Sequence, residues 1–277
     1  MHPIRLKSEV TIEDPNFWGF KGKLIFSPLG SDYGWIWRDN RKFFISINPS
    51  IVDKKARRTR LYFEGKKLQI YEHIGVLRWF GLCGLSIRST SWPPYYGRSF
   101  EFWQAIKPFC EQDMSKHINW YTIRKPVRWN YPKLRNNQTA FTEIRPNTKK
   151  ELKMEIMCSY SGMGAWTNYF SFPNNEELEK LCLTYGQGWP PYLYHFSKIA
   201  SKGGWPHHRA FIWVQEHGKG LIILEQFINH RAADLLGSLS LLCRDGLLSA
   251  SVTSICSGYE ADIKTIFQAD KLLYSLE

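Results

Sequence analysis

Apolar residues near the C-terminal end of the chain repeat with the spacing of an α-helix. Five of them follow one another at intervals of four and three residues: Ile228, Ala232, Leu235, Leu239 and Leu242. This spacing aligns their side chains along one face of a helix. The pattern therefore predicts a helix that begins at about Phe227 and runs toward Leu242.

Other segments also carry helical patterns. They cover residues 73–80, 99–109, 174–183 and 192–200, and a last one runs from about Ala261. The first has apolar residues at i+3, i+4 and i+7 from His73, and the second places Phe109 on its apolar side. The third opens with Asn-Asn-Glu-Glu, residue types that favour a helix N-terminus.

Short runs of β-branched and aromatic residues, bounded by Gly, Pro, Ser and Asp, predict strands. They lie at residues 23–26, 33–37, 43–47, 68–71, 85–87, 119–129, 139–145, 151–158, 169–172, 210–214, 221–224 and 251–256, the last of the series. Residues 159–168 contain glycines and predict a turn region between two of them.

Strands and helices mix without regular alternation, which predicts an α+β fold. The polar stretch 110–118 separates two halves of similar style. We therefore expect two domains, residues 1–114 and 115–277, each a small β-sheet packed on helices.

The composition indicates which kinds of partner the protein is expected to bind. The chain of 277 residues has a net charge of +12 and a pI of about 9.4, which favours acidic partners such as phosphates, nucleic acid or an anionic membrane surface. The expected partner is an acidic or phosphorylated small molecule, and the charge also allows a peripheral membrane contact. No nucleic-acid motif accompanies the charge, and nucleic acid is not an expected partner. The basic run 54–60 is expected to be a solvated loop rather than a phosphate site.

The cysteines and the apolar runs indicate the cellular compartment in which the protein is expected. The six Cys form no C-x-x-C pair, which argues against a structural zinc ribbon and favours reduced thiols in the cytoplasm. The N-terminal residues lack the apolar core of a signal peptide. No run reaches the length of about 18 apolar residues that a spanning helix needs. We expect a cytoplasmic monomer.

Two pairs of residues suggest metal chemistry. His230 and Asp234 are four residues apart on the predicted helix, where one ion can bind both. Such a pair alone is more often an ordinary polar contact at a helix surface. Glu72 and His73, at the start of another helix, add a further ligand and a carboxylate that can act as a base.

These pairs, with several motifs in the same order, resemble the zinc-dependent UDP-3-O-acyl-N-acetylglucosamine deacetylases of the lipid A pathway. The matching motifs are Gly-Trp-Ile-Trp-Arg at 34–38, Tyr-Glu-His-Ile at 71–74, Leu-Thr-Tyr-Gly at 183–186, Phe-Ile-Asn-His-Arg-Ala-Ala-Asp at 227–234 and Ser-Gly at 257–258. The resemblance is distant and spans nearly the whole chain. It implies two α+β domains with the active site in the cleft between them.

The resemblance also implies roles for individual residues. Zinc would be bound by His73, His230 and Asp234, with Glu72 as the general base. Thr184 would hold the tetrahedral intermediate, while Tyr185 and Arg231 would contact the substrate. Zinc polarises an amide carbonyl and lowers the pKa of bound water toward ~7, which a carboxylate base and an oxyanion donor complement.

Two departures from the family pattern concern catalysis. Tyr259 stands where the family has its catalytic histidine, and Ser238 stands where it has the partner aspartate. A tyrosine, with a reference pKa of about 10, is a neutral donor at pH 7. We expect Tyr259 to assist the oxyanion while Glu72 moves the protons.

The sequence therefore predicts a zinc-dependent deacetylase that removes an N-acyl group from an amino sugar or related amide, with a substrate other than the lipid A precursor. One alternative is a non-catalytic relative that binds a nucleotide sugar or a lipid. Another is a basic, aromatic nucleic-acid binder, which only the charge and the composition favour. The acyl length, the sugar and the effect of the altered pair at Ser238 and Tyr259 stay open.

Overall fold

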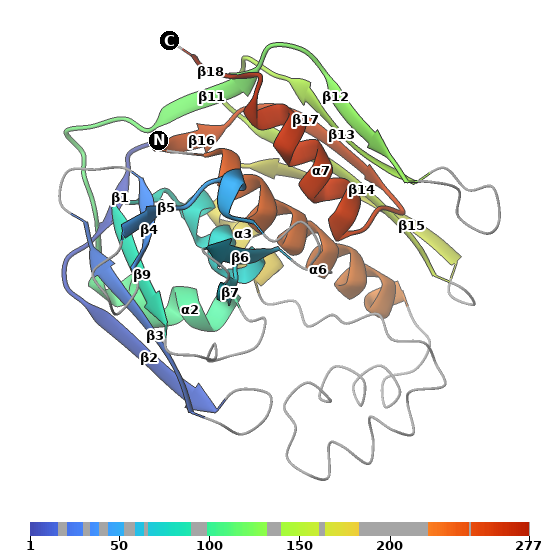
Figure 1. Cartoon of the computed structure of the whole chain (residues 1–277). Helices are drawn as coiled ribbons and strands as arrows, with labels where there is room; N and C mark the ends of the chain where they lie inside the picture. The colour runs from blue at the N-terminus through green and yellow to red at the C-terminus, as the bar shows by residue number, and fades with distance from the viewer. Residues whose placement is uncertain are drawn as a thin grey trace, which may run out of the picture.

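The computed structural model of the chain has mixed α+β content. It describes residues 1–15, 21–29, 34–38, 44–52, 59–63, 66–89, 99–131, 140–160, 164–182, 221–243 and 245–276. Helices gather at the centre, and the two larger sheets lie on either side of them (Figure 1).

Strands before residue 115 pair only with one another in the described chain. A five-stranded sheet has the order β2 (Val10–Pro15), β3 (Lys21–Pro28), β9 (Leu85–Ser89), β4 (Trp35–Arg38), β5 (Phe44–Ser46). A three-stranded sheet has the order β10 (Cys110–Gln112), β1 (Ile4–Leu6), β8 (Leu82–Cys83). Strands β6 (Arg60–Phe63) and β7 (Lys66–Ile70) form a separate antiparallel pair.

Strands after residue 115 likewise pair among themselves in the described chain. The five-stranded sheet has the order β12 (Val127–Asn130), β13 (Phe141–Pro146), β17 (Ala250–Ile255), β14 (Leu152–Tyr160), β15 (Gly164–Phe172). The three-stranded sheet has the order β16 (Gly246–Leu248), β11 (Asn119–Ile123), β18 (Leu273–Leu276). In β17, buried and half-buried residues alternate, as in a strand with one face on the core.

The two halves share one topology. In each five-stranded sheet, the third and fourth strands pair in parallel and all other neighbours pair antiparallel. In each three-stranded sheet, the central strand has one parallel and one antiparallel neighbour. The β6–β7 pair is the element of the first half without a counterpart among the described strands.

The helices fit the same repeat. In the first half, α1 (Glu72–Gly75) and the 3-10 helix η2 (Val76–Phe80) precede β8, and α2 (Ser99–Ile106) with η3 (Lys107–Phe109) precedes β10. In the second half, α6 (Leu221–Leu239) and η5 (Ser240–Leu242) precede β16, and α7 (Tyr259–Asp270) precedes β18. Helix α1 therefore corresponds to α6, and α2 to α7.

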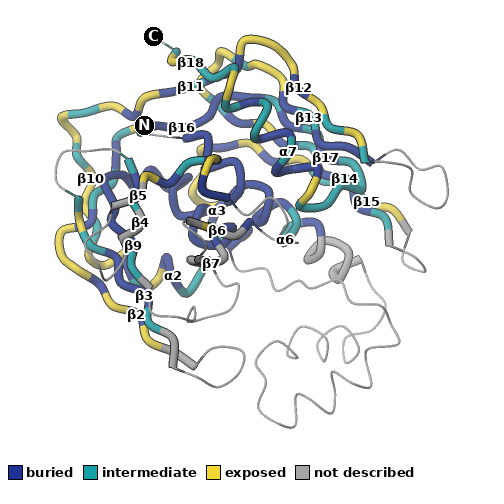
Figure 2. The backbone as a smooth tube through the Cα atoms, in the orientation of Figure 1, coloured by how far each residue is buried: buried dark blue, intermediate teal, exposed yellow. Residues whose placement is uncertain are grey.

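The central helices form the most buried part of the molecule (Figure 2). Helix α6 packs on β14, β15, α7 and α1. The five residues of its predicted stripe are fully buried, which confirms that interpretation. Trp79 on η2 donates a hydrogen bond from Nε1 to the carbonyl oxygen of Leu236, 2.8 Å away, and so links the two halves.

Helix α3 (Asn175–Cys182) confirms a second prediction. The side chain of Asn174 accepts hydrogen bonds from the backbone N–H groups of Glu176 and Glu177, at 3.1 and 3.2 Å. An asparagine in this position satisfies N–H groups that have no partner inside the helix.

Several predicted boundaries are wrong. Residues 221–224 form the first turn of α6 rather than a strand, because four apolar residues carry too little periodicity to separate helix from strand. The segment 119–129 is two strands, β11 and β12. The expected turn region 159–168 is much shorter, since β14 and β15 pair from Tyr160 and Gly164 outward.

The segments 99–118 and 251–276 also differ from the prediction. Helix α2 ends at Ile106, ahead of Pro108, which lacks the N–H that a continuing helix needs, and Phe109 is exposed. The polar break at 110–118 contains β10. Strand β17 is followed by a further strand, β18, which adds to the edge of the small sheet. The expected helix at 192–200 and strand at 210–214 lie outside the described residues.

Candidate metal centre

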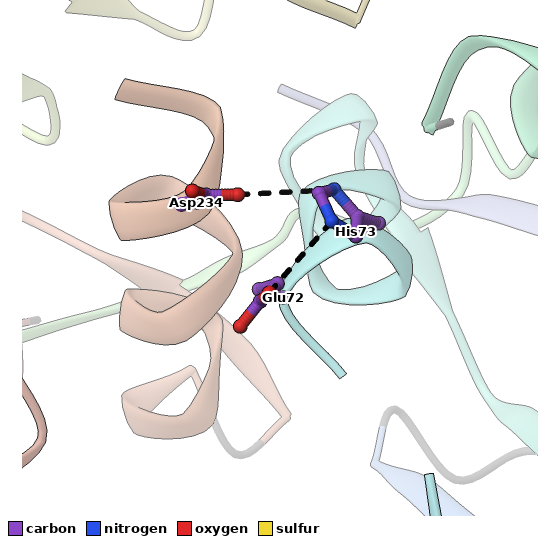
Figure 3. A group of neighbouring side chains, drawn as sticks. All are labelled: Glu72, His73 and Asp234. Atoms are coloured by element: carbon purple, nitrogen blue, oxygen red, sulfur yellow. Dashed lines mark ion pairs between the residues drawn. The ribbon is translucent and has the colours of Figure 1, made fainter. Parts of the chain in front are cut away.

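The candidate centre lies where the corresponding helices α1 and α6 pack together. Glu72 and His73 occupy the first turn of α1, and Asp234 projects from α6 toward them (Figure 3). One ligand atom from each of these three residues lies within 4.8 Å of the other two. The site therefore combines residues 161 positions apart in sequence, 234 minus 73, through a helix contact.

Each ring nitrogen of His73 faces a different carboxylate. Nδ1 lies 3.9 Å from Oδ1 of Asp234, and Nε2 lies 3.7 Å from Oε1 of Glu72. These separations are too long for hydrogen bonds. Two ligands of a tetrahedral zinc with bonds of about 2.0–2.1 Å lie roughly 3.4 Å apart, so an ion fits between His73 and Asp234 with little movement.

His230 stands on the same helix face as Asp234. Its Nε2 lies 3.6 Å from Oδ2 of Asp234, and its ring centroid lies 5.7 Å from that of His73. The side chain of His230 is 18% exposed, compared with 4% for Asp234 and 7% for His73. His230 is therefore the member of the group nearest to solvent.

Asp234 is held ionised in a buried position. Burial alone would raise the pKa of this carboxyl, but the charges of His230 and His73 oppose that effect. A hydrogen bond from Tyr259 and the charge of Arg231 lower the pKa further, so that it falls below its usual value. Oδ1 of Asp234 is buried and accepts no hydrogen bond, which leaves a charged oxygen in the interior that a cation can satisfy.

Glu72 is fully buried, and a backbone group just before β6 holds one of its carboxylate oxygens. Its Oε2 accepts a hydrogen bond from the backbone N–H of Thr59 at 2.7 Å. The hydroxyls of Thr59 and Ser238 lie 2.6 Å apart, and Ser238 donates to the backbone carbonyl of Asp234 at 2.8 Å. Glu72 is thus held next to His73, with Oε1 on the side of Nε2 of that ring.

Tyr259 and Arg231 both connect α6 to α7. The Tyr259 hydroxyl donates a hydrogen bond to Oδ2 of Asp234 at 2.6 Å. Nη2 of Arg231 lies 2.6 Å from Oδ2 of Asp262 and donates to Ser257 at 3.0 Å. Nε and Nη1 of Arg231 are buried as well, so the guanidinium faces the interior of the protein.

Of the residues predicted from sequence, the structure brings together Glu72, His73, His230, Asp234 and Tyr259. Thr184 and Tyr185 lie outside the described residues. Arg231 is paired with Asp262. The roles of all eight predicted residues stay predictions.

Thr59 and Asp262 complete the surroundings of the site and were not predicted. Thr59 belongs to the basic run that was expected to be solvated, yet it is fully buried. Its contacts are with residues 13 and 179 positions away, which no local pattern indicates.

The donor set suits a divalent metal of intermediate softness. Imidazole nitrogens together with one carboxylate oxygen are ligands that zinc accepts, and a carboxylate beside them can serve as a base. The orphaned Oδ1 of Asp234 and its distance of 3.9 Å from Nδ1 of His73 fit such an ion. His230 faces the other oxygen of Asp234 and lies outside the compact cluster of ligand atoms formed by Glu72, His73 and Asp234.

The chain matches no protein-family model and no curated protein. Among the described residues, no helix has the length and apolar character that crossing a bilayer requires.

Proposed function

We propose that the protein is a zinc-dependent amidohydrolase that removes an acyl group from an amino sugar or a related amide. The observation that carries this proposal is the buried meeting of Glu72, His73 and Asp234 at the α1–α6 contact, with His230 beside it. The distant resemblance to UDP-3-O-acyl-N-acetylglucosamine deacetylases supplies the reaction class.

In this proposal His73, His230 and Asp234 hold the ion. Zinc supplies Lewis acidity, which polarises an amide carbonyl and makes water a stronger acid near neutral pH. Glu72 takes the proton from the attacking water and passes it to the departing amine. The backbone N–H of Thr59 supports this role by holding one oxygen of Glu72 and leaving Oε1 on the side of His73.

The net charge of +12 favours a phosphorylated or acidic substrate. Among Glu72, His73, His230 and Asp234, the side chain of His230 is the most exposed, which supports entry of the substrate from its side of α6. The reaction is hydrolysis of a linear C–N bond, with a free amine and a carboxylate as products.

Zinc quantitation coupled to an amine-release screen over N-acyl sugars tests the proposal. We expect about one zinc per chain, and the variants His73→Ala, His230→Ala and Asp234→Ala should each lose most of it. His117→Ala is the matched control, because that ring lies beside the ring of His2, with centroids 4.6 Å apart, and belongs to no metal cluster of the described chain. Full zinc content in the His230→Ala variant would show that the ligand set is wrong.

The same screen separates the enzyme from a non-catalytic relative. Wild-type protein that holds zinc and releases amine from at least one N-acyl sugar supports the hydrolase. Protein that holds zinc but cleaves nothing in a broad panel supports a protein that only binds a nucleotide sugar or lipid.

A further inference from the structure

Two contacts of similar length join α6 to the first turn of α7. Arg231 and Asp234 are three residues apart on α6, and Tyr259 and Asp262 are three residues apart on α7. Arg231 pairs with Asp262 at 2.6 Å, and Tyr259 donates to Asp234 at 2.6 Å. Because residues three apart lie on the same side of a helix, these contacts form two neighbouring rungs between the helices.

The rung formed by Arg231 and Asp262 is rigidly held. The Asp262 carboxylate is fully buried, and its Oδ1 accepts hydrogen bonds from Arg231 at 2.7 Å and from the Thr142 hydroxyl at 2.7 Å. Burial alone would lower the pKa of the Arg231 guanidinium. The charge of Asp262, together with Tyr259 and Asp234, raises this pKa above its ordinary value. A buried ion pair with this many hydrogen bonds fixes the distance between its two helices.

The rung formed by Tyr259 and Asp234 reaches the candidate metal centre itself. Oδ2 of Asp234 carries the hydrogen bond from Tyr259, while Oδ1 points to Nδ1 of His73. The Asp234 carboxylate can rotate about its Cβ–Cγ bond, and the hydrogen bond from the Tyr259 hydroxyl stabilises one orientation. The phenol thus determines which oxygen of Asp234 is presented to His73.

We propose that Tyr259 is a positioning residue that orients Asp234 for the metal, and that the Arg231–Asp262 pair positions Tyr259. This inference rests on the proposed function and specifies how the site is built. It gives Arg231 a role inside the protein, through the first turn of α7, rather than a contact with substrate. The guanidinium carbon of Arg231 lies 6.0 Å from the centre of the Tyr259 ring, at the outer limit of a cation–π interaction between the two pairs.

Groups that hydrogen-bond to a metal ligand typically change metal affinity by about 10–100-fold when they are removed. We therefore expect Tyr259→Phe to weaken binding of zinc, measured by competition with a chromophoric chelator, by about that factor. The visible spectrum of the cobalt-substituted full-length protein should change at the same time, because the carboxylate is freed to bind in another way.

Tyr121→Phe provides a matched control. The Tyr121 hydroxyl also donates to a carboxylate, that of Asp245. Tyr121 lies on β11, the central strand of a three-stranded sheet, and not on α6 or α7. This variant loses a comparable hydrogen bond and should keep the wild-type zinc affinity and cobalt spectrum.

Arg231→Lys tests the second half of the proposal. Nη2 of Arg231 makes the contacts to both Asp262 and Ser257. Lysine keeps a positive charge opposite Asp262, but its side chain is shorter and has no guanidinium plane beside the Tyr259 ring. We expect about a 10-fold loss of zinc affinity. Since Arg231 acts through Tyr259, the double variant should bind zinc no more weakly than Tyr259→Phe alone.

The possible failures are distinct. Wild-type protein that binds neither zinc nor cobalt overturns the proposed function. Wild-type protein that binds both, with a Tyr259→Phe variant of equal affinity and unchanged cobalt spectrum, overturns only the positioning role of Tyr259. Additive losses in the double variant would show that Arg231 does not act through Tyr259.

Discussion

The carbonyl oxygen of Gly237 fills the space that a Cβ atom on Gly75 would occupy. The same close approach is present on α6, because a Cβ on Gly237 would overlap the backbone carbonyl of Glu72. The absence of both side chains lets α1 and α6 approach until their backbones touch. This close approach brings Glu72 and His73 of one half against Asp234 of the other.

Gly237→Ala should therefore damage the metal centre directly. The overlap is with backbone, which cannot move aside as a flexible side chain can, so α6 has to shift from α1. Overpacking of this kind costs about 1–3 kcal/mol of stability. Zinc content and the urea midpoint should both fall. Gly34→Ala is the control, since a Cβ there meets nothing within 4 Å, and it should leave zinc content unchanged. Equal zinc content in the two variants would contradict this account of the contact.

Glu72→Gln should separate metal binding from catalysis. The amide can still accept the hydrogen bond from the backbone N–H of Thr59, so the backbone of α1 should stay in place. It cannot accept a proton from water, and loss of a general base typically costs 10²–10⁴-fold in rate. We expect near-normal zinc content with amine release reduced by about that factor. An active variant would exclude Glu72 as the base.

The depressed pKa of Asp234 predicts how the stability of the metal-free protein depends on pH. A carboxyl whose pKa is lower in the folded state than its unfolded value of about 3.9 stabilises the fold above that pH. The contribution is lost as the pH falls through the folded pKa. Urea unfolding of the wild type and of Asp234→Asn between pH 3 and 7 measures it. The difference in free energy of unfolding between the wild type and the variant should be larger at neutral pH and shrink below about pH 4. A difference that widens in acid would contradict the prediction.

The cysteines should react with alkylating reagents mainly after unfolding. Burial raises the pKa of Cys83 and Cys110 to about 11 and that of Cys243 to about 12, so their reactive thiolate forms are scarce at pH 8. Iodoacetamide labelling followed by mass spectrometry should find slow modification at these positions in the native protein. In denaturant all six residues should be labelled, because the described structure contains each as a free thiol.

Local periodicity determined the helices and most of the strands. The stripe from Ile228 to Leu242 predicts helix α6 because a helix repeats every 3.6 residues whatever surrounds it. It does not predict that the other faces of the helix are buried as well from Ala232 onward. The start of that helix at Leu221 could not be found in this way, since its first residues are apolar without a distinct period. Short edge strands such as β10 and β18 were missed for a related reason, because their formation depends on partners far away in sequence.

The sequence by itself also determined which residue types can form the site. Glu72 beside His73, and His230 four residues before Asp234, indicate metal chemistry because spacing on a helix fixes which side chains share a face. Only the tertiary structure decided that α1 and α6 meet, because that contact depends on two glycines 162 residues apart, 237 minus 75. It also decided that Tyr259 donates to Asp234 and that Arg231 is paired with Asp262. These contacts join separate helices, and a side chain's partner across such an interface is set by packing, which no periodicity in the chain records.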